Sequence, residues 1–518
     1  GSPAGAAGAG AAGAEQGEGA CPAGGCEGSS GLQDTNPEGY YWRRRGGGNE
    51  VITSVPHRGP TDLSKGPAWT WANTLDEQVR HSPLIDAEKN IYMATAVRIR
   101  KFDERGEEKW TFETTRREGK MVGSPAIYKG TLYAMAYSLV TLTVTMYALD
   151  MQTGQQKWQQ SIKQAFTNPD ATSLLVYNDT IIFPMRDHLL PRGSHEQDGN
   201  NQVRAMNASD GKPLWEYTAD DAFWNLMVST PGDGTLLFSS QCGGVYRINW
   251  AGEQIWRAGR PNPGRFCGTG GGTLGPNGMF YAEFNDVARQ QGVVAAHRVN
   301  DGKLVWERTW PRVFGGWQYP GVGRLTPNGR LAVVAPLGGI TSSPRFPGLG
   351  LLDYDWVPFW LKNFWFERVY LKSSWVRRHI LRVPILANAV VALDAETGED
   401  IWWVTEEPWD RYAMAGDEEG LLKRFARQPA DPQRAESCIC LPDTQGIPLI
   451  AGDGTVYFSS SHTGDLRSIR DIDGNGVIDP TEISKFSTGI GFLNGPSLAP
   501  GMLVAAPCWG PMYVFKDS

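Results

Sequence analysis

A short motif that recurs along the chain constrains its fold more than any other feature. The motif reads Ala-x-Asp, then Thr-Gly, then Trp, and it occurs with identical spacing at residues 148–158 and 392–402. Looser copies end at Trp215 and Trp306, and copies one residue shorter end at Trp110 and Trp256. Self-similarity at a regular period predicts an architecture built from repeated structural units.

Each copy combines strand signals with turn signals. The stretch 145–149 alternates as a strand does, and the Asp-x-x-Thr-Gly segment is typical of a tight hairpin turn because Gly supplies a positive φ. The Trp then falls on the next strand, where its large ring needs burial. A second hairpin precedes each copy, as at Lys129-Gly130. Each repeat therefore reads as four antiparallel strands, which is one blade of a β-propeller.

The number of repeats predicts how the ring closes. Six blades end in the motif tryptophans, and Phe486 takes the corresponding place in a seventh. The C-terminal strands near 497–499, 502–506 and 512–515 lack a fourth, which the stretch 66–71 can supply from the other end of the chain. Such pairing would remove the open edges of the terminal blades. The sequence predicts an all-β, eight-bladed β-propeller over residues 66–516, with its last blade closed by an N-terminal strand.

The repeat resembles the tryptophan-docking repeat of pyrroloquinoline-quinone-type (quinoprotein-like) β-propellers. That family includes the quinoprotein alcohol dehydrogenases and the lipoprotein scaffold of the bacterial outer-membrane barrel-assembly machine. The resemblance implies the propeller fold over residues 66–516, but the repeat holds blades together and performs no chemistry. For the dehydrogenases it also implies a disulfide between adjacent cysteines, and this chain has no Cys-Cys pair. We therefore do not expect a bound quinone and assign no catalytic residue.

Composition excludes several other classes of function. The net charge of −7 and the absence of a Lys/Arg block outside one insertion argue against a nucleic-acid partner. No uncharged apolar run is long enough to span a bilayer. Residues 1–48 form a Gly/Ala-rich lead without an initiator Met, which predicts disorder. We interpret it as the remainder of a processed targeting segment, which places a soluble or membrane-peripheral protein outside the cytoplasm or in an organelle lumen.

The seven cysteines define no metal cluster. Their odd number leaves at least one thiol unpaired within a monomer. Cys21 and Cys26 could close a small loop in an oxidising compartment, and no nearby histidine completes a zinc site with them. For Cys508 the expectation is a small buried core residue without a redox role.

One twelve-residue segment carries the sharpest chemical motif. Residues 471–482 match the EF-hand calcium loop at every ligand position, with Gly476 at the sharp turn and Ile478 directed back to the protein. The expected ligands are Asp471, Asp473, Asn475, the Val477 carbonyl, Asp479 and Glu482. The flanks are too short for two helices, so the loop replaces the blade-seven hairpin turn. A lone site without a paired loop predicts structural Ca²⁺, with an affinity near about 10⁻⁴ M.

Two insertions interrupt the repeats near blades six and seven. The first spans 341–388, and its stretch 344–384 holds ten aromatic residues and seven Lys/Arg against three acids. We consider three roles for it: an anchor for a partner protein, a lid that buries its rings on the propeller, and a membrane-surface segment. The basic residues scatter around a 3.6-residue wheel, which disfavours the membrane role. The second insertion spans 406–441, so both elaborate one part of the ring.

The sequence thus predicts a non-enzymatic, calcium-binding propeller scaffold. It would bind protein partners through the insertion 344–384 and the elaborated blade six to seven face, within a larger and membrane-associated assembly. The alternative is a quinone-dependent dehydrogenase with an altered active site, because the fold is shared with that class.

Overall fold

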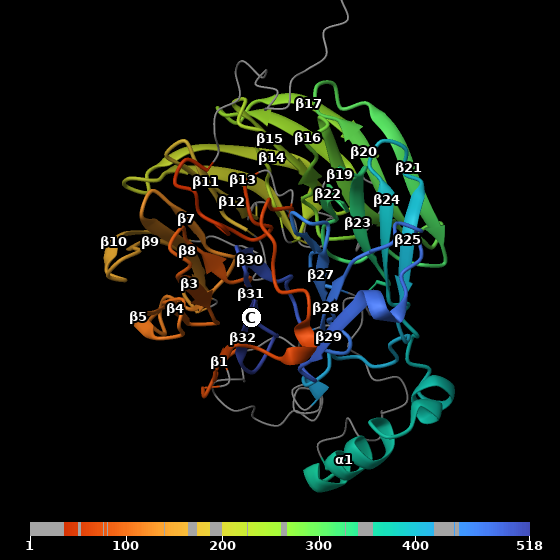
Figure 1. The fold of residues 1–518 in the computed structure, drawn as a ribbon. Coiled ribbons are helices and arrows are strands. Elements are labelled where there is room, and N and C mark those ends of the chain that lie inside the picture. The colour runs from red at the N-terminus through yellow and green to blue at the C-terminus, as the bar shows by residue number, and fades with distance from the viewer. Residues whose placement is uncertain are drawn as a thin grey trace, which may run out of the picture.

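The computed structural model describes most of the chain: residues 36–49, 53–75, 77–79, 81–138, 140–163, 173–186, 199–224, 226–260, 267–326, 328–339, 356–418, 440 and 445–517. Eight separate antiparallel sheets lie around a common centre (Figure 1). The predicted all-β, eight-bladed propeller is confirmed.

The first four blades follow one another along the chain. In blade 4 a bridge between Ser229 and Leu237 takes the place of the first strand of the other blades. Their strands are β2 (Leu84–Ile85), β3 (Ile91–Ala94), β4 (Arg98–Phe102) and β5 (Glu108–Glu113) in blade 1; β6 (Lys120–Met121), β7 (Ala126–Tyr128), β8 (Thr131–Ser138), β9 (Thr143–Asp150) and β10 (Gln156–Lys163) in blade 2; β11 (Leu175–Tyr177), β12 (Thr180–Met185), β13 (Asn200–Asn207) and β14 (Pro213–Phe223) in blade 3; β15 (Thr235–Ser239), β16 (Gly244–Asn249) and β17 (Gln254–Gly259) in blade 4.

The remaining blades complete the ring. Their strands are β18 (Thr273–Leu274), β19 (Met279–Asp286), β20 (Gln291–Arg298) and β21 (Leu304–Pro311) in blade 5; β22 (Gly321–Arg324), β23 (Leu331–Leu337), β24 (Ala389–Asp394) and β25 (Asp400–Thr405) in blade 6; β26 (Leu449–Ile450), β27 (Val456–Ser459), β28 (Asp465–Ile469) and β29 (Ile483–Ser487) in blade 7; β30 (Ser497–Ala499), β31 (Met502–Ala505), β32 (Met512–Lys516) and the N-terminal β1 (Trp69–Trp71) in blade 8.

The up-and-down strand order gives the ring two different faces. The turns after the first and third strand of each blade lie on one face, which we call the turn face. The connections between blades, and those between second and third strands, lie on the other, which we call the connection face. Both insertions belong to the connection face because they follow β23 and β25.

A repeated tryptophan–glycine contact holds neighbouring blades together. The rings of Trp69 and of every motif tryptophan except Trp402 cover the glycine in the next blade's third-to-fourth-strand turn, where an added Cβ would lie 2.6–2.8 Å from the ring. The indole Nε1 donates a hydrogen bond of 2.9–3.2 Å to a carbonyl oxygen of the next blade. The pairs are Trp69 on Gly106, Trp110 on Gly154, Trp158 on Gly211, Trp215 on Gly252, Trp256 on Gly302 and Trp306 on Gly398.

The ring closes by pairing the two ends of the chain. β1 pairs antiparallel with β32, with Thr70 opposite Tyr513. Figure 1 shows β1, in red, beside the blue β32. Trp69 then contacts Gly106 of blade 1, so the N-terminal strand also supplies the contact that joins blade 8 to blade 1. The predicted closure is confirmed.

The segment before β1 corrects the expected disorder of residues 1–48. Residues 1–35 lie outside the described residues, but 36–49 pack into the propeller together with 53–66, and we call these two stretches the strap. Trp42 is buried and pairs with Ile85 of blade 1. The sequence predicted disorder because residues 1–48 are rich in Gly and Ala; Arg44 and Arg45 instead donate hydrogen bonds to buried acceptors.

Buried arginines of the strap contact several blades. The Arg44 guanidinium donates hydrogen bonds to the Ser173 hydroxyl at 3.2 Å and the Val228 carbonyl at 2.7 Å. The Arg45 guanidinium donates to Gln318 Oε1 at 2.6 Å. On the turn face, the main-chain N–H of Lys129 donates to the Glu38 carboxylate at 3.0 Å. The strap thereby links blades 2, 3, 4 and 6.

Helices are confined to short segments outside the sheets. η1 (Leu63–Lys65) belongs to the strap, and η5 (Pro480–Glu482) belongs to the predicted calcium loop. The blade-six insertion contains α1 (Phe359–Trp365) and two π-helical turns, η3 (Phe366–Tyr370) and η4 (Val376–Ile380). No helix in the described ranges has both the length and the apolar character needed to cross a bilayer.

The tryptophan–glycine contact predicts a matched pair of stability changes. Gly154 has φ +70° and lies under Trp110, whereas Gly130 has φ +68° with nothing within 4 Å of an added Cβ. Both Gly→Ala changes strain the backbone by about 1 kcal/mol. Only Gly154→Ala also displaces a ring, and we expect an additional loss of about 1–3 kcal/mol. Denaturant unfolding of both variants measures the difference, and equal losses would contradict the docking role.

A turn acid predicts a pH dependence. Hydrogen bonding to Lys109 at 2.9 Å, aided by backbone N–H groups, lowers the pKa of Asp103 to about 2. Because the pKa of Asp103 is lower in the folded state, its ionised form stabilises the fold at pH values above the unfolded-state pKa of about 3.9. This stabilisation is lost as the pH falls to the folded-state pKa of about 2. Asp103→Asn should therefore cost up to about 0.5 kcal/mol at pH 7, because the pair is exposed, and less at pH 3. Unfolding midpoints at both pH values test this; a loss independent of pH would contradict it.

Candidate functional site

The segment that matches a calcium loop lies between β28 and β29, on the turn face. It occupies the third-to-fourth-strand turn of blade 7, the position that holds the Asp-x-x-Thr-Gly turn in other blades. Strands flank it on both sides, as the spacing of the sequence predicts. β28 pairs with β29 through Ile469 opposite Ile483, so the sheet fixes both ends of the loop.

Side-chain oxygens of the loop point inward and accept its own N–H groups. The two Asp471 oxygens accept from the N–H of Gly474 at 2.7 Å and Gly476 at 3.0 Å. The two Glu482 oxygens accept from the N–H of Ile472 at 2.6 Å and Asp479 at 3.0 Å. These bonds coil the loop around a centre toward which its carboxylates converge.

Three of the six expected ligands lie close together. Asp471, Asp473 and Glu482 each offer a carboxylate oxygen, and these oxygens lie within 4.8 Å of one another. Among the described residues this is the one group of three or more His, Cys, Asp or Glu side chains with that spacing. Asn475 Oδ1 instead accepts from the Val477 N–H at 2.6 Å. Carboxylates this close repel each other unless a cation lies between them.

The loop also occupies the position at which other blades carry the glycine covered by a neighbouring tryptophan. Trp402 of blade 6 is buried in a cluster with Ile469, and Ile478 and Ile483 pack against this cluster from blade 7. A Cβ on Gly476 would lie 2.9 Å from the Ile401 carbonyl oxygen. The predicted calcium loop therefore forms part of the blade 6–7 junction. The sequence signal was available, because Trp402 has no ordinary Thr-Gly turn in the following blade.

The strap covers the sheet beside this loop. Ser484 Oγ accepts a hydrogen bond from the Leu63 N–H at 2.8 Å, and Ser468 Oγ donates to the Thr61 carbonyl at 2.5 Å. A cleft of about 560 Å³ lies between the strap, β28, β29 and the loop, and Glu482 is one of its lining residues. The loop is thus linked through two serines to the segment that leads into β1.

On the connection face, a buried polar network joins the bases of the two insertions. Asn388 Nδ2 donates to the Glu406 carboxylate at 2.9 Å, and Gln445 Nε2 donates to Asn388 Oδ1 at 2.8 Å. Glu406 also forms an ion pair with Arg467 of β28. Burial raises the pKa of Glu406, partly offset by Arg467. This network fixes where both insertions leave the ring.

Beyond their bases, the two insertions pack on each other. Arg377 and Arg378 both bind the buried carboxylate of Asp410, at 2.9 and 2.7 Å. The main-chain N–H of Tyr412 donates to the Tyr370 hydroxyl at 3.1 Å. Buried Phe366, Tyr370 and Leu381 form one apolar cluster with Tyr412. The rings that are buried thus face the second insertion, not the propeller as in the lid interpretation.

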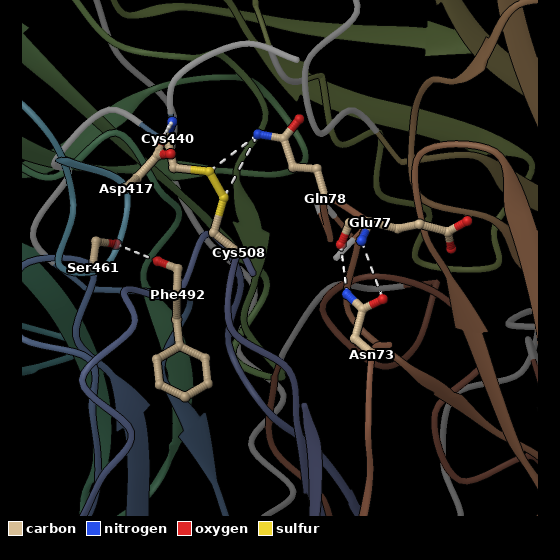
Figure 2. The surroundings of a disulfide bond; sticks show 8 residues. All are labelled: Asn73, Glu77, Gln78, Asp417, Cys440, Ser461, Phe492 and Cys508. Atoms are coloured by element: carbon tan, nitrogen blue, oxygen red, sulfur yellow. Dashed lines mark hydrogen bonds between the residues drawn. A yellow bond between two sulfur atoms is a disulfide. The ribbon is translucent and has the colours of Figure 1, made fainter. Parts of the chain in front are cut away.

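Two disulfides lie on the connection face, and one corrects the sequence interpretation. Cys242 bonds to Cys267, and Cys440 bonds to Cys508. Cys508 is therefore a disulfide partner and not an isolated core thiol; its partner lies 68 residues away, too remote for spacing to reveal. Figure 2 shows Gln78 donating to both sulfurs of this bond, at 3.1 and 3.6 Å. Cys21, Cys26 and Cys438 lie outside the described residues.

The described residues do not fit a bound quinone of the dehydrogenase type. Both disulfides join residues far apart in sequence, with separations of 25 and 68, so neither is the adjacent-cysteine bridge that the resemblance implies. The one described acidic cluster with metal-ligand spacing lies in a turn of blade 7 and not on the axis. We derive no reaction step through such a cofactor.

Comparison with solved structures supports the fold alone. The BamB structure from Moraxella catarrhalis is similar with a TM-score of 0.51 and 12% identity, over 87% of this chain and 99% of that one. Quinohemoprotein alcohol dehydrogenase from Comamonas testosteroni is similar with a TM-score of 0.55 and 13% identity, over 92% of this chain and 80% of that one. The search of curated proteins found no match.

The sequence itself matches one family. Residues 66–184 and 185–334 fit the family described as outer membrane protein assembly factor BamB, and together they span more than half of the chain. The matched stretches contain five of the motif tryptophans that dock neighbouring blades, Trp110, Trp158, Trp215, Trp256 and Trp306. The chain therefore belongs to the BamB-like family of pyrroloquinoline-quinone-type β-propellers.

Proposed function

We propose that the protein is a non-enzymatic, calcium-binding propeller scaffold that binds protein partners in a larger assembly outside the cytoplasm. The observation that carries the proposal is the connection face. There, two insertions leave neighbouring blades, fold on each other, and are fixed by buried Asp410 and Glu406. Such a preorganised projection on a rigid ring suits recognition, because little conformational freedom is lost on binding. The family description, an assembly factor, supports the same conclusion.

The two disulfides support a location outside the cytoplasm. Disulfides persist in oxidising compartments and are rare in cytosolic proteins. Cys440–Cys508 joins the second insertion to blade 8, so an oxidising environment would also fix the connection face.

The calcium loop serves the scaffold as a junction and not as a sensor. Asp471, Asp473, Asn475, Asp479 and Glu482, with the Val477 carbonyl, would surround Ca²⁺ with oxygen ligands. The ion would relieve repulsion between the three converging carboxylates. It would also fix Gly476 and Ile478 at the blade 6–7 junction, which lacks the tryptophan–glycine contact found at six other junctions.

Calcium should stabilise the wild-type protein. With a dissociation constant of about 10⁻⁴ M, 1 mM Ca²⁺ contributes about 1.4 kcal/mol, seen as a melting temperature a few degrees higher than in chelator. Glu482→Gln should abolish this difference because it removes the bidentate carboxylate. Asp301→Asn, in the corresponding turn of blade 5, is the matched control and should keep it. A calcium effect that survives Glu482→Gln rejects the site.

Partner binding should map to the connection face. A photo-reactive residue at Glu407, on the exposed part of the second insertion, should cross-link to a protein partner in native cells. The same residue at Asp301, on the turn face, should not. Mass spectrometry of the cross-linked products measures both. Cross-links from Asp301 alone, or from neither position, would contradict the scaffold proposal as stated.

The dehydrogenase alternative is tested separately. Purified protein supplied with pyrroloquinoline quinone, calcium and an alcohol should give no dye reduction above background. Sustained dye reduction that depends on added quinone would overturn the non-enzymatic assignment, whatever the cross-linking shows.

A further inference from the structure

The blade-six insertion exposes large aromatic side chains on one surface. α1, η3 and η4 project away from the ring, as Figure 1 shows for α1. Their buried side, with Phe366 and Tyr370, packs on the second insertion. Four large aromatic side chains remain exposed on the segment: Trp356 at 73%, Trp360 at 69%, Phe364 at 57% and Trp375 at 60%.

Exposed basic residues accompany these rings. Arg368, Lys372, Arg378 and Arg382 are all exposed, and Glu367 is the one exposed acid of the described stretch 356–387. The chain as a whole carries a net charge of −7, whereas the stretch 356–387 has six Lys/Arg against one acid. We call the exposed aromatic and basic residues of 356–385 the aromatic–basic ridge.

The local helix geometry explains why the sequence disfavoured an amphipathic segment. η3 and η4 are π-helical, with wider turns than an α-helix, and residues 371–373 separate them. A helical wheel with 3.6 residues per turn therefore places the side chains after Trp365 on the wrong face of the segment. In the folded segment two of the scattered basic residues, Lys362 and Arg377, are buried, while the others named above are exposed.

We propose that the aromatic–basic ridge docks onto an anionic lipid surface. The ridge is a projection and not a groove, so it suits insertion into a deformable layer. Trp rings favour the boundary between headgroups and acyl chains, and Lys/Arg beside them bind lipid phosphates. The core of a protein–protein interface is by contrast depleted in charge, whereas here exposed basic residues lie on both sides of Trp375 in the sequence. This inference goes beyond the scaffold function and does not depend on it.

The ridge is held rigidly enough to act as one unit. Arg377, bound to Asp410, also donates from Nη1 to the main-chain carbonyls of Tyr370 at 2.5 Å and Leu371 at 3.1 Å. These bonds satisfy carbonyl groups at the break between η3 and η4. The backbone that carries the aromatic side chains is thereby ordered before binding, which lowers the entropic cost of docking.

Flotation of the purified full chain with vesicles tests the proposal. We compare phosphatidylcholine vesicles with vesicles containing about one third phosphatidylglycerol, at low and physiological salt. Wild type should bind the anionic vesicles at least tenfold more tightly, and less so as salt rises. Replacing Arg368, Lys372 and Arg382 together by Gln should weaken binding about a hundredfold, since each charge near such a surface contributes about fivefold.

A second variant separates insertion of the rings from charge alone. Trp360→Ser with Phe364→Ser and Trp375→Ser should reduce the blue shift of tryptophan fluorescence on anionic vesicles, because only Trp356 of the exposed ridge tryptophans remains, and should weaken binding at least tenfold. The control Leu214→Ser with Ile255→Ser and Leu304→Ser changes exposed apolar residues on three outer strands and should leave binding intact. Circular dichroism and melting confirm that each variant is folded.

Three outcomes would overturn the proposal. The first is no binding to either vesicle. The second is equal binding to neutral and anionic vesicles. The third is binding that both ridge variants retain. If vesicle binding is absent and the same ridge variants lose a cross-linked protein partner, the ridge belongs to a protein interface instead.

Discussion

The structure depends on a contact in which an indole ring covers a glycine of the neighbouring blade. A side chain at that glycine would collide with the ring, as the 2.6 Å separation at Gly154 shows. The indole N–H also finds a carbonyl acceptor across the junction. Because each contact spans two blades, a ring of eight otherwise separate sheets becomes one body. The terminal strand β1 takes part in the same way, through Trp69.

This contact explains how much the sequence could predict. The spacing of Asp, Gly and Trp defines both a turn and its neighbour's docking site, so blade number and closure followed from local patterns. The packing of the strap could not be predicted from local patterns, because the burial of Arg44 and Arg45 depends on acceptors such as Ser173 and Gln318 that are distant in sequence. Cys440–Cys508 was missed for the same reason. The calcium site stays a prediction, which the sequence could make because all of its expected ligands lie within twelve residues.

The two faces of the ring divide the proposed roles. The turn face holds the blade junctions, the strap and the predicted calcium loop, all of which concern the integrity of the ring. The connection face holds both disulfides and both insertions, which leave the ring without interrupting a docking contact. Long insertions are tolerated there because β23 and β24 still pair beneath the first one. The aromatic–basic ridge extends this face away from the ring.

Blade 7 is where the structural and proposed functional features meet. The usual docking turn is replaced there by a loop whose carboxylates converge, and Trp402 packs against a cluster that includes Ile478 of that loop. Hydrogen exchange of β25, β28 and β29, measured with calcium and with chelator, tests this account most directly. We expect calcium to slow exchange in these strands and to leave β9 and β10 of blade 2 unchanged. Unchanged exchange at the blade 6–7 junction, or a uniform change around the ring, would contradict it.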